Sequence, residues 1–268
     1  MYGSQTLSIQ AAWGIAMKVN SIGTLLSILA ALLLAPAIAV AAEIQVIQSI
    51  GMKEAFIELV PSFEKATGHK VTTTWVGFAD IPTRLLAGET FDVVIAAARM
   101  IDGLTKQNGI VSGSRVDLAR SGVGIVVKAG APRPDISTTE TLKRALLGAR
   151  SIAYSSGSSG NYLIGLFQRM GIYEKIKPKL KRATSAVPVG TLVASGEAEL
   201  GFQQVSELIR FPGVDFIGPL PADIQFNTVF SAAIPSRATQ PDAAKALLKF
   251  LSSPAAAPAI RKMGMDPI

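Results

Sequence analysis

From residue 44 onward, short apolar runs alternate with segments in which apolar residues recur at the helical period. The run FDVVIAA at 91–97 is continuous, as is typical of a parallel strand that is buried on both faces. Gly68 is expected to end the first helix, and Pro61 to bend or restart it. In this half of the chain we predict strands at residues 44–48, 71–76, 91–97 and 121–128. The predicted helices cover residues 52–63, 81–87 and 100–107. These elements form a βαβαβ unit.

A second series of strands and helices follows the segment 129–137, which contains two prolines. Its strands are predicted at residues 151–154, near 182, and at 200–204, 214–217 and 226–234. The helices are predicted at residues 139–147, 159–170, 189–195, 241–252 and 255–263. The fold class is therefore α/β, with two units joined by extended segments and a cleft between two lobes. In open α/β sheets, ligands bind beyond the carboxyl ends of the strands, so the turns from strand to helix are the informative positions.

The amino-terminal 42 residues have the pattern of a secretory signal peptide. Lys18 precedes an apolar stretch at 22–34, and Pro36 is followed by small residues that end in an Ala-x-Ala sequence. We expect cleavage after Ala41 or Ala42 and hence a protein of the periplasm.

Two alternatives concern the same segment. Residues 22–40 could nearly span a bilayer, which would make the segment a permanent membrane anchor. Met17 opens the signal pattern better than Met1, so residues 1–16 are a candidate extension of the gene model. We favour the cleaved signal peptide, with this extension, for residues 1–42.

Composition disfavours several classes of catalysis. The chain has 268 residues, no cysteine and a single histidine, His69, which excludes thiolate chemistry and multi-histidine metal sites. His69 is expected in a solvent-exposed turn at the opposite end of the strands from the cleft. No Gly-x-Ser-x-Gly motif occurs, and the acidic residues are dispersed. We therefore expect that the chain is not an enzyme and has neither a cofactor nor a metal cation held by protein ligands.

The charge balance is mildly basic, with 26 Lys and Arg against 19 Asp and Glu. Lys18 is the only charged residue in 1–42, so the mature chain keeps a formal charge of about +6. The densest basic stretch, at 175–182, is interpreted as solvated surface. Because no basic stripe is interleaved with aromatic residues, nucleic acid is not an expected partner. The mild positive charge favours a small anion as the ligand.

Three turns from strand to helix offer candidate ligand contacts. Gly51 allows close approach of the backbone, and the free N–H groups that open the following helix attract anions. Phe78 either forms a pocket wall or packs inside the protein. Arg99 either clamps a carboxylate bidentately or lies on the surface. The candidates at these turns are Ser49, Ile50, Gly51, Met52, Phe78, Ala79 and Arg99.

The strongest local signal is the Ser/Gly-rich loop YSSGSSGNY at 154–162. The loop lies between a predicted strand and a predicted helix, so its hydroxyl and N–H groups converge on one point and suit a small anion. The alternative is a flexible turn with ordinary helix capping. The loop lacks the Gly-Lys-Ser/Thr and dinucleotide glycine patterns, so it is not a nucleotide site. The candidates from this loop and from later strand ends are Ser158, Ser159, Asn161, Tyr162, Ser185 and Gln204.

Several segments together carry a family resemblance. They are IQVIQSIGMKEA at 44–55, AGETFDVV at 87–94, SIAYSSGSSGNY at 151–162, GEAELG at 196–201 and FLSSPAA at 250–256. With them, residues 43–268 resemble the molybdate-binding, type II family of periplasmic solute-binding proteins of ABC transporters.

This resemblance implies two lobes, each a mixed and mostly parallel sheet flanked by helices, with a two-strand hinge that closes on the ligand. The first lobe would comprise residues 43–124 and 227–268, and the second residues 125–226. A monomer that delivers its ligand to the membrane permease of an ABC transporter is expected.

In this family, molybdate is held by serine hydroxyls, backbone N–H groups and a tyrosine hydroxyl. By resemblance, the serines correspond to Gly51 and to Phe78 or Ala79, and the tyrosine to Gln204. All three side-chain donors therefore depart from the family pattern, and each missing hydrogen bond to a buried anion costs about 1–3 kcal/mol.

By the same resemblance, backbone N–H donors to the ligand are expected at Ser159 and near Ser185. It implies capture of a small anion, with molybdate or tungstate as the leading candidate. The alternatives are a small organic acid, for which Arg99 would be a carboxylate partner, and a ligand sensor or secreted enzyme with the same fold.

Overall fold

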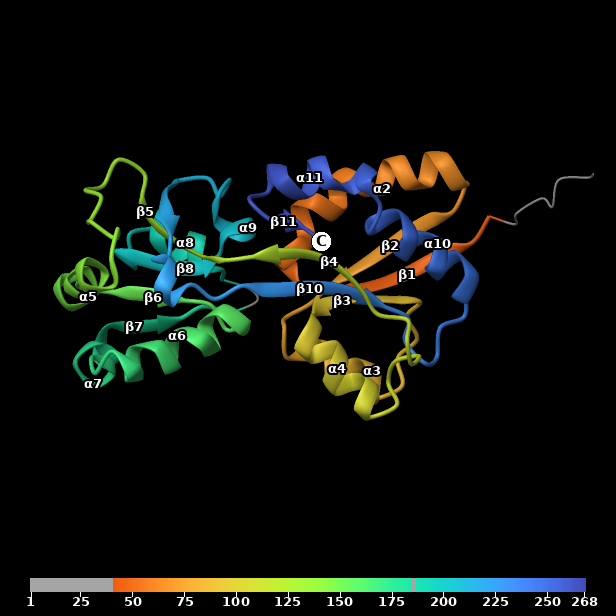
Figure 1. The fold of residues 1–268 in the computed structure, drawn as a ribbon, viewed down its shortest axis with the longest axis horizontal. Coiled ribbons are helices and arrows are strands. Elements are labelled where there is room, and N and C mark those ends of the chain that lie inside the picture. Colours follow the sequence, from red (N-terminus) through yellow and green to blue (C-terminus); the bar gives the residue numbers. More distant parts are fainter. Residues whose placement is uncertain (1–40, 185–186) are drawn as a thin grey trace, which may run out of the picture. The chain divides into compact units, whose positions relative to one another are not determined.

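The computed structural model describes residues 41–184 and 187–268, which form two β-sheets and the helices packed on them (Figure 1). The strands of the first sheet are β1 (Glu43–Gln48), β2 (Lys70–Trp75), β3 (Val93–Ala97), β4 (Val116–Ser121), β10 (Thr228–Ala233) and β11 (Asp266–Pro267). Those of the second sheet are β5 (Val123–Lys128), β6 (Ile152–Tyr154), β7 (Leu180–Arg182), β8 (Leu200–Gln204) and β9 (Val214–Pro219). The strand orders are β11-β4-β10-β3-β1-β2 and β7-β6-β8-β5-β9.

Both sheets mix parallel and antiparallel pairs. In the first sheet, β1 is parallel to β2 and β3, whereas β10 is antiparallel to β3 and β4. In the second, β6 is parallel to β7 and β8, whereas β5 is antiparallel to β8 and β9. The parallel strands of each sheet therefore end at one edge, where the strand-to-helix turns collect. This is the α/β class with two mixed sheets that the sequence predicts.

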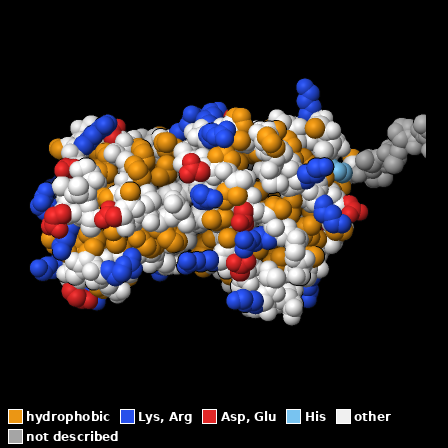
Figure 2. Space-filling view, viewed as in Figure 1, with side chains coloured by type: hydrophobic (Ala, Val, Ile, Leu, Met, Phe, Trp, Pro, Cys, Tyr) orange, Lys and Arg blue, Asp and Glu red, His pale blue; other side chains and the backbone are white. Residues whose placement is uncertain are grey.

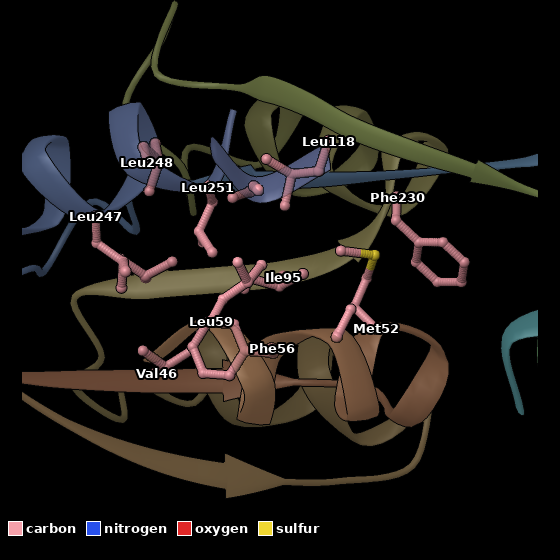
Figure 3. Packing of buried hydrophobic residues seen from close by; sticks show 14 of the residues in the cluster. Val46, Met52, Phe56, Leu59, Ile95, Leu118, Phe230, Leu247, Leu248 and Leu251 are labelled. Carbon is pink, nitrogen blue, oxygen red and sulfur yellow. The ribbon is translucent and has the colours of Figure 1, made fainter. Parts of the chain in front are cut away.

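Helices cover both faces of the first sheet. On one face lie α2 (Lys53–Thr67), α10 (Pro241–Leu251) and α11 (Ala257–Lys262), and on the other α3 (Asp80–Leu86) and α4 (Ala98–Lys106). The core between the first group and the sheet includes Phe56, Leu59, Ile95 and Leu247, which are almost completely buried (Figure 3). Burial of each such side chain contributes about 1.5–3 kcal/mol, so this cluster accounts for the helical period read from the sequence.

The second sheet is covered in the same way. One face packs against α5 (Thr139–Gly148), α6 (Ser158–Arg169) and α7 (Tyr173–Ile176), the other against α8 (Val189–Ala194) and α9 (Val205–Leu208). Successive residues of β5 alternate between the two cores: Ile125 packs with the first group and Val126 with the second. Apolar residues are therefore favoured at consecutive positions, as residues 125–127 show. Short 3₁₀ turns complete the chain as η1 (Ile50–Met52), η2 (Lys177–Lys179), η3 (Ala222–Ile224) and η4 (Pro254–Ala256).

The chain crosses between the sheets twice within the described residues. The first crossing is at Gly122, which separates β4 from β5, so the single strand predicted at 121–128 is wrong. The second crossing follows β9. The side chain of Gln225 joins the two crossing segments, because its Oε1 accepts from Val123 N at 2.9 Å and its Nε2 donates to Val123 O at 3.2 Å. A Cβ atom at Gly122 would lie 2.9 Å from Gln225 Nε2, so a side chain there would displace the amide that joins the crossings.

Two further differences from the sequence expectation are local. Helix α2 continues through Pro61 without a restart and ends, as predicted, at Gly68, whose φ of 75° is left-handed. Strand β11 was not predicted because two residues carry no periodicity. The predicted signal peptide falls almost wholly on residues outside the described part of the chain. No helix in the described part is sufficiently long and apolar to cross a membrane.

A buried carboxylate joins the start of β3 to β1 and to the segment that leads into the carboxy-terminal helices. Asp92, which is 1% exposed, accepts hydrogen bonds from the backbone N–H groups of Gln45, Thr239 and Gln240, each at 2.8 Å. A buried charge is tolerated only when it is fully hydrogen-bonded, and here the charge orders the segment that leads into α10.

We expect the substitution Asp92→Ala to lower the free energy of unfolding by about 3 kcal/mol or more, because it leaves several buried N–H groups without an acceptor. Urea denaturation followed by circular dichroism measures this loss. The substitution Asp242→Ala, at a side chain that is 92% exposed, is the control and should leave the midpoint unchanged. Equal midpoints for the two variants would contradict this role of Asp92.

Candidate functional site

A cavity of about 280 Å³ lies where the carboxyl ends of β1 and β2 meet those of β6 and β8. We call it the central pocket. Among the residues predicted as ligand contacts, those that line it are Ser49, Ile50, Gly51, Phe78, Ser158, Ser159 and Gln204. Its volume is close to the lower end of the roughly 300–1,000 Å³ typical of small-molecule sites.

The Ser/Gly-rich loop supplies backbone donors to this pocket. Gly157, the residue that precedes α6, forms no side-chain cap, and the N–H groups of Ser158 and Ser159 have no acceptor among the described residues. The hydroxyl of Ser155 fixes the loop: it accepts from Gly160 N at 3.1 Å and lies 2.8 Å from Ser159 Oγ. The first N–H groups of a helix attract anions, so this end of the pocket suits a carboxylate or an oxyanion.

Glycine is obligatory at one point of this loop. A Cβ atom at Gly160 would lie 1.7 Å from the carbonyl oxygen of Ser155, closer than atoms can approach. The tight turn therefore brings the start of α6 against the end of β6, which is what places the free N–H groups at the pocket.

The pocket also contains a cation that the sequence analysis missed. Lys53, at the start of α2, lines the pocket with its ammonium group 5.7 Å from the centre of the Trp75 ring. It forms no ion pair with any acidic residue in the described ranges. The position two residues after Gly51, in a turn already singled out, is the signal that could have identified it.

Glu207 is the one acidic residue that lines the central pocket in the described chain, and it too was missed. It lies on α9, directly after the carboxyl end of β8, and its carboxylate accepts a hydrogen bond from Gln203 Nε2. The side chain keeps some accessible surface, yet burial of the carboxyl raises its pKa to about 8, against the opposing effect of the Gln203 hydrogen bond. The strand-to-helix rule applied to β8 would have found it.

Phe230 occupies the place expected for a serine side chain. Gly51 has no room for one, because a Cβ atom there would lie 2.2 Å from Phe230 Cζ. Phe230 packs in the core of the first sheet and also lines the pocket (Figure 3). An aromatic ring from β10 thus replaces a hydroxyl donor, which makes this wall of the pocket apolar.

Gln204, the position expected for the tyrosine donor, is engaged at the crossing between the sheets. The side-chain amide of Gln204 is oriented so that its oxygen and its nitrogen both have hydrogen-bond partners. In this orientation Nε2 donates to Ser121 O at 2.9 Å and to Gly122 O at 3.2 Å. Its Oε1 accepts from Thr228 Oγ1 at 2.7 Å. The residue therefore borders the pocket but uses its hydrogen-bonding groups to join the two sheets.

A second cavity of about 510 Å³, the side pocket, shares Phe78 and Ser158 with the central pocket. Arg99, Asn161 and Tyr162 line it. Phe226 stacks on Tyr162 with ring centres 4.6 Å apart, and the Arg99 guanidinium lies 5.9 Å from the centre of the Phe226 ring. This contact orients the guanidinium, and no acidic residue in the described part of the chain forms an ion pair with it.

Other predicted contacts lie elsewhere. Met52 packs in the core beside Phe56 (Figure 3), and Ala79 precedes α3 outside both linings. Ser185 lies outside the described residues. His69, expected to be solvent-exposed, is partly buried and accepts from Ala42 N at 3.1 Å through Nδ1, in neither pocket. In residues 41–184 and 187–268, no cluster of three or more His, Cys, Asp or Glu could hold a metal ion.

Charge on the surface is dispersed. On the face shown in Figure 2, Lys and Arg side chains are spread over both halves of the view, with Asp and Glu between them. The cationic side chains available to bind an anion are therefore those that line the two pockets. They are Lys53 in the central pocket and Arg99 in the side pocket.

Two mixed sheets flanked by helices, with a donor-lined pocket at the carboxyl ends of the strands, define the class as a type II periplasmic binding protein fold. The molybdate-binding protein of Azotobacter vinelandii has this fold, and its structure superposes with a TM-score of 0.69 at 22% identity, over 83% of this chain and 98% of that one. The chain belongs to the bacterial extracellular solute-binding protein family, whose model matches residues 44–266. This membership implies binding of a small solute.

Two curated relatives are informative about the ligand. Aconitate isomerase from a Pseudomonas species is 41% identical over 250 residues, which cover 90% of this chain and 95% of that protein. The molybdate-binding protein ModA of Azotobacter vinelandii is 30% identical over 230 residues, which cover 84% and 90%.

The expectation that the chain is not an enzyme is wrong, because the more similar of these two relatives is one. Neither a histidine motif nor an activated serine motif occurs in the sequence. The carboxyl group of Glu207 is brought into the pocket by the fold, and no motif indicates it.

The close contact at Gly51 gives a testable outcome. We expect Gly51→Ser to destabilise the protein by about 1–3 kcal/mol, because the added atoms must displace the ring of Phe230. In a Phe230→Ala background the same change should cost less, as a double-mutant cycle in thermal unfolding would measure. Additive effects of the two changes would show that the ring does not exclude a side chain at Gly51.

Proposed function

We propose that this protein is an isomerase of a small unsaturated polycarboxylic acid, with aconitate as the leading candidate. The observation that carries the proposal is the 41% identity to aconitate isomerase over nearly the full length of both chains. The ligand class thereby changes from an inorganic oxyanion to an organic acid, one of the alternatives that the sequence left open.

The chemistry of the central pocket supports an organic acid. Phe78, Trp75 and Phe230 supply apolar walls that suit a carbon skeleton better than a metal oxyanion. Two of the expected molybdate donors are absent, since Gly51 carries no hydroxyl and Gln204 is engaged at the crossing. A compact dianion that loses these hydrogen bonds would bind weakly, whereas an organic acid would also gain from contact with the apolar walls.

The positively charged groups and the free N–H groups lie at separate places in the two pockets, as binding of a molecule with several carboxylates requires. Aconitate is a propene that carries a carboxylate on each of its three carbon atoms. One carboxylate would bind the N–H groups of Ser158 and Ser159, a second the ammonium group of Lys53, and the third Arg99 in the adjoining side pocket. Because the pockets share Phe78 and Ser158, one small molecule can contact both.

A second role, delivery of a solute to the permease of an ABC transporter, is compatible with isomerase activity. The family membership favours it. Three expectations remain part of this proposal. They are export to the periplasm by a cleaved signal peptide at residues 1–42, a monomeric state, and a division into two lobes, one at 43–124 with 227–268 and one at 125–226. Binding of a solute with no turnover of any acid would favour delivery as the main role.

The proposal is tested by incubating the purified protein separately with cis- and trans-aconitate and following both isomers by proton NMR. We expect the two samples to reach the same equilibrium mixture. A thermal-shift panel should show stabilisation by aconitate and by saturated tricarboxylates, and none by molybdate, tungstate or sulfate. A response to molybdate alone, without conversion of aconitate, would contradict the proposal.

Arg99 should determine the preference for a third carboxylate. We expect Arg99→Gln to raise the KM for a tricarboxylate by about 10- to 100-fold, the loss of one charge-assisted hydrogen bond, while kcat changes little. Inhibition by dicarboxylates should be unaffected, since these do not reach the side pocket. Arg150→Gln, at a side chain that is 90% exposed, is the matched control. An unchanged KM in Arg99→Gln would remove this residue from the site.

A further inference from the structure

We propose that Glu207 carries the proton that the isomerisation moves, first as general base and then as general acid. This inference rests on the proposed function. It assigns a catalytic role to a residue that no motif in the sequence indicates.

The position of Glu207 is the first argument. Within the described residues it is the only carboxyl side chain that lines either pocket, and no histidine lines them. The hydroxyl group of Tyr162, the other titratable oxygen, already donates to Ile224 O at 2.7 Å. Glu207 shares the central pocket with Lys53 and with the free N–H groups of α6, so a carboxylate bound there brings its carbon chain to Glu207.

The rigidity of α9 is the second argument. Ser206 Oγ donates to Gly51 O at 2.8 Å, and Val205 N donates to Gly122 O at 2.9 Å. Gln203, near the end of β8, donates a hydrogen bond to the carboxylate of Glu207. Glu207 is thus attached to a segment that is hydrogen-bonded to Gly51, in the turn after β1, and to Gly122 at the crossing, which fixes its backbone beside the pocket.

The reaction needs one group that both removes and returns a proton. The carboxylate of Glu207 takes a proton from the methylene carbon of the substrate; that C–H bond breaks, and its electron pair spreads over the three-carbon unit into the flanking carboxylates. The carboxylic acid of Glu207 then gives the proton to the former alkene carbon, where a new C–H bond forms. The double bond has moved by one position and is free to form in either geometry, with no oxidant, reductant or cofactor consumed.

The surroundings make this proton transfer feasible. Negative charge that develops on the substrate carboxylates is stabilised by Lys53 and by the N–H groups of Ser158 and Ser159. Burial raises the pKa of Glu207 to about 8, which makes its carboxylate a stronger base than an ordinary glutamate near neutral pH. The base is the ionised form, so kcat/KM should rise with pH and level off above about 8.

Other charged groups near Glu207 are identifiable. A third cavity is lined by Glu207 together with Glu54, Glu58, Arg210 and Lys262. Glu58 is paired with Lys262 at 2.7 Å. Together with Lys53 in the central pocket, these are the charges that face Glu207 from α2, α11 and the end of α9.

The decisive variant is Glu207→Gln, which keeps the size of the side chain and removes the base. We expect it to lower kcat for aconitate by about 10²- to 10⁴-fold, while the Kd for aconitate from titration calorimetry changes less than about threefold. Glu207→Asp should retain part of the activity with a shifted pH profile. Glu54→Gln, in the third cavity but outside the central pocket, is the control and should keep the wild-type kcat and pH profile.

The outcomes separate the two proposals. If the wild-type protein isomerises no acid, the proposed function fails and this inference fails with it. If the wild type isomerises aconitate and Glu207→Gln retains a tenth or more of its kcat, or if the wild-type rate falls as pH rises toward 8, only the role of Glu207 is overturned.

Stability provides a readout that does not depend on catalysis. The pKa of Glu207 is raised above its unfolded value of about 4.5, so its carboxyl destabilises the fold progressively as pH rises from about 5 to about 8. The difference in Tm between Glu207→Gln and wild type should therefore increase in favour of the variant over this interval. A difference that stays constant with pH would show that the carboxyl is not buried as the geometry requires.

Discussion

The hydrogen bonds at the crossing between the two sheets are the constraint on which the site depends. Val205 N and the amide of Gln204 both bind Gly122 O, and Ser206 Oγ reaches across to Gly51 O. These bonds hold the carboxyl ends of β1 and β8 against one another. The loop after β6 and the turn after β1 consequently face the same cavity, although they are about a hundred residues apart in the chain.

The central pocket offers backbone N–H donors for an anion but few side-chain hydroxyl donors. The free N–H groups at the start of α6 suit any small anion, since they recognise charge rather than shape. Phe230 in place of a hydroxyl at Gly51, and Gln204 engaged at the crossing, remove directional donors. Apolar surface together with separated cations favours an organic acid with several carboxylates over a compact inorganic dianion.

In the function proposed for this protein, a fold that binds solutes would gain catalytic chemistry through the placement of one carboxyl group. In the central pocket Glu207 is partly buried, Gln203 donates a hydrogen bond to its carboxylate, and Lys53 also lines the pocket. No histidine, cysteine or metal cluster is needed for a reaction that only relocates a proton. The same donors that would bind a solute thus stabilise charge during its reaction, which connects the two roles proposed for the protein.

The sequence by itself determined the α/β class, the end of α2 at Gly68 and several of the turns that line the central pocket, because these features follow from local periodicity and backbone preference. It could not reveal that Gly122 divides one apolar run between two sheets, since apolar periodicity does not identify the partner of a strand. Only the tertiary structure decided that Phe230 fills the space beside Gly51 and that the carboxyl of Glu207 is buried. Both depend on side chains brought together from distant segments, and the free energy of such contacts is not encoded in any local pattern.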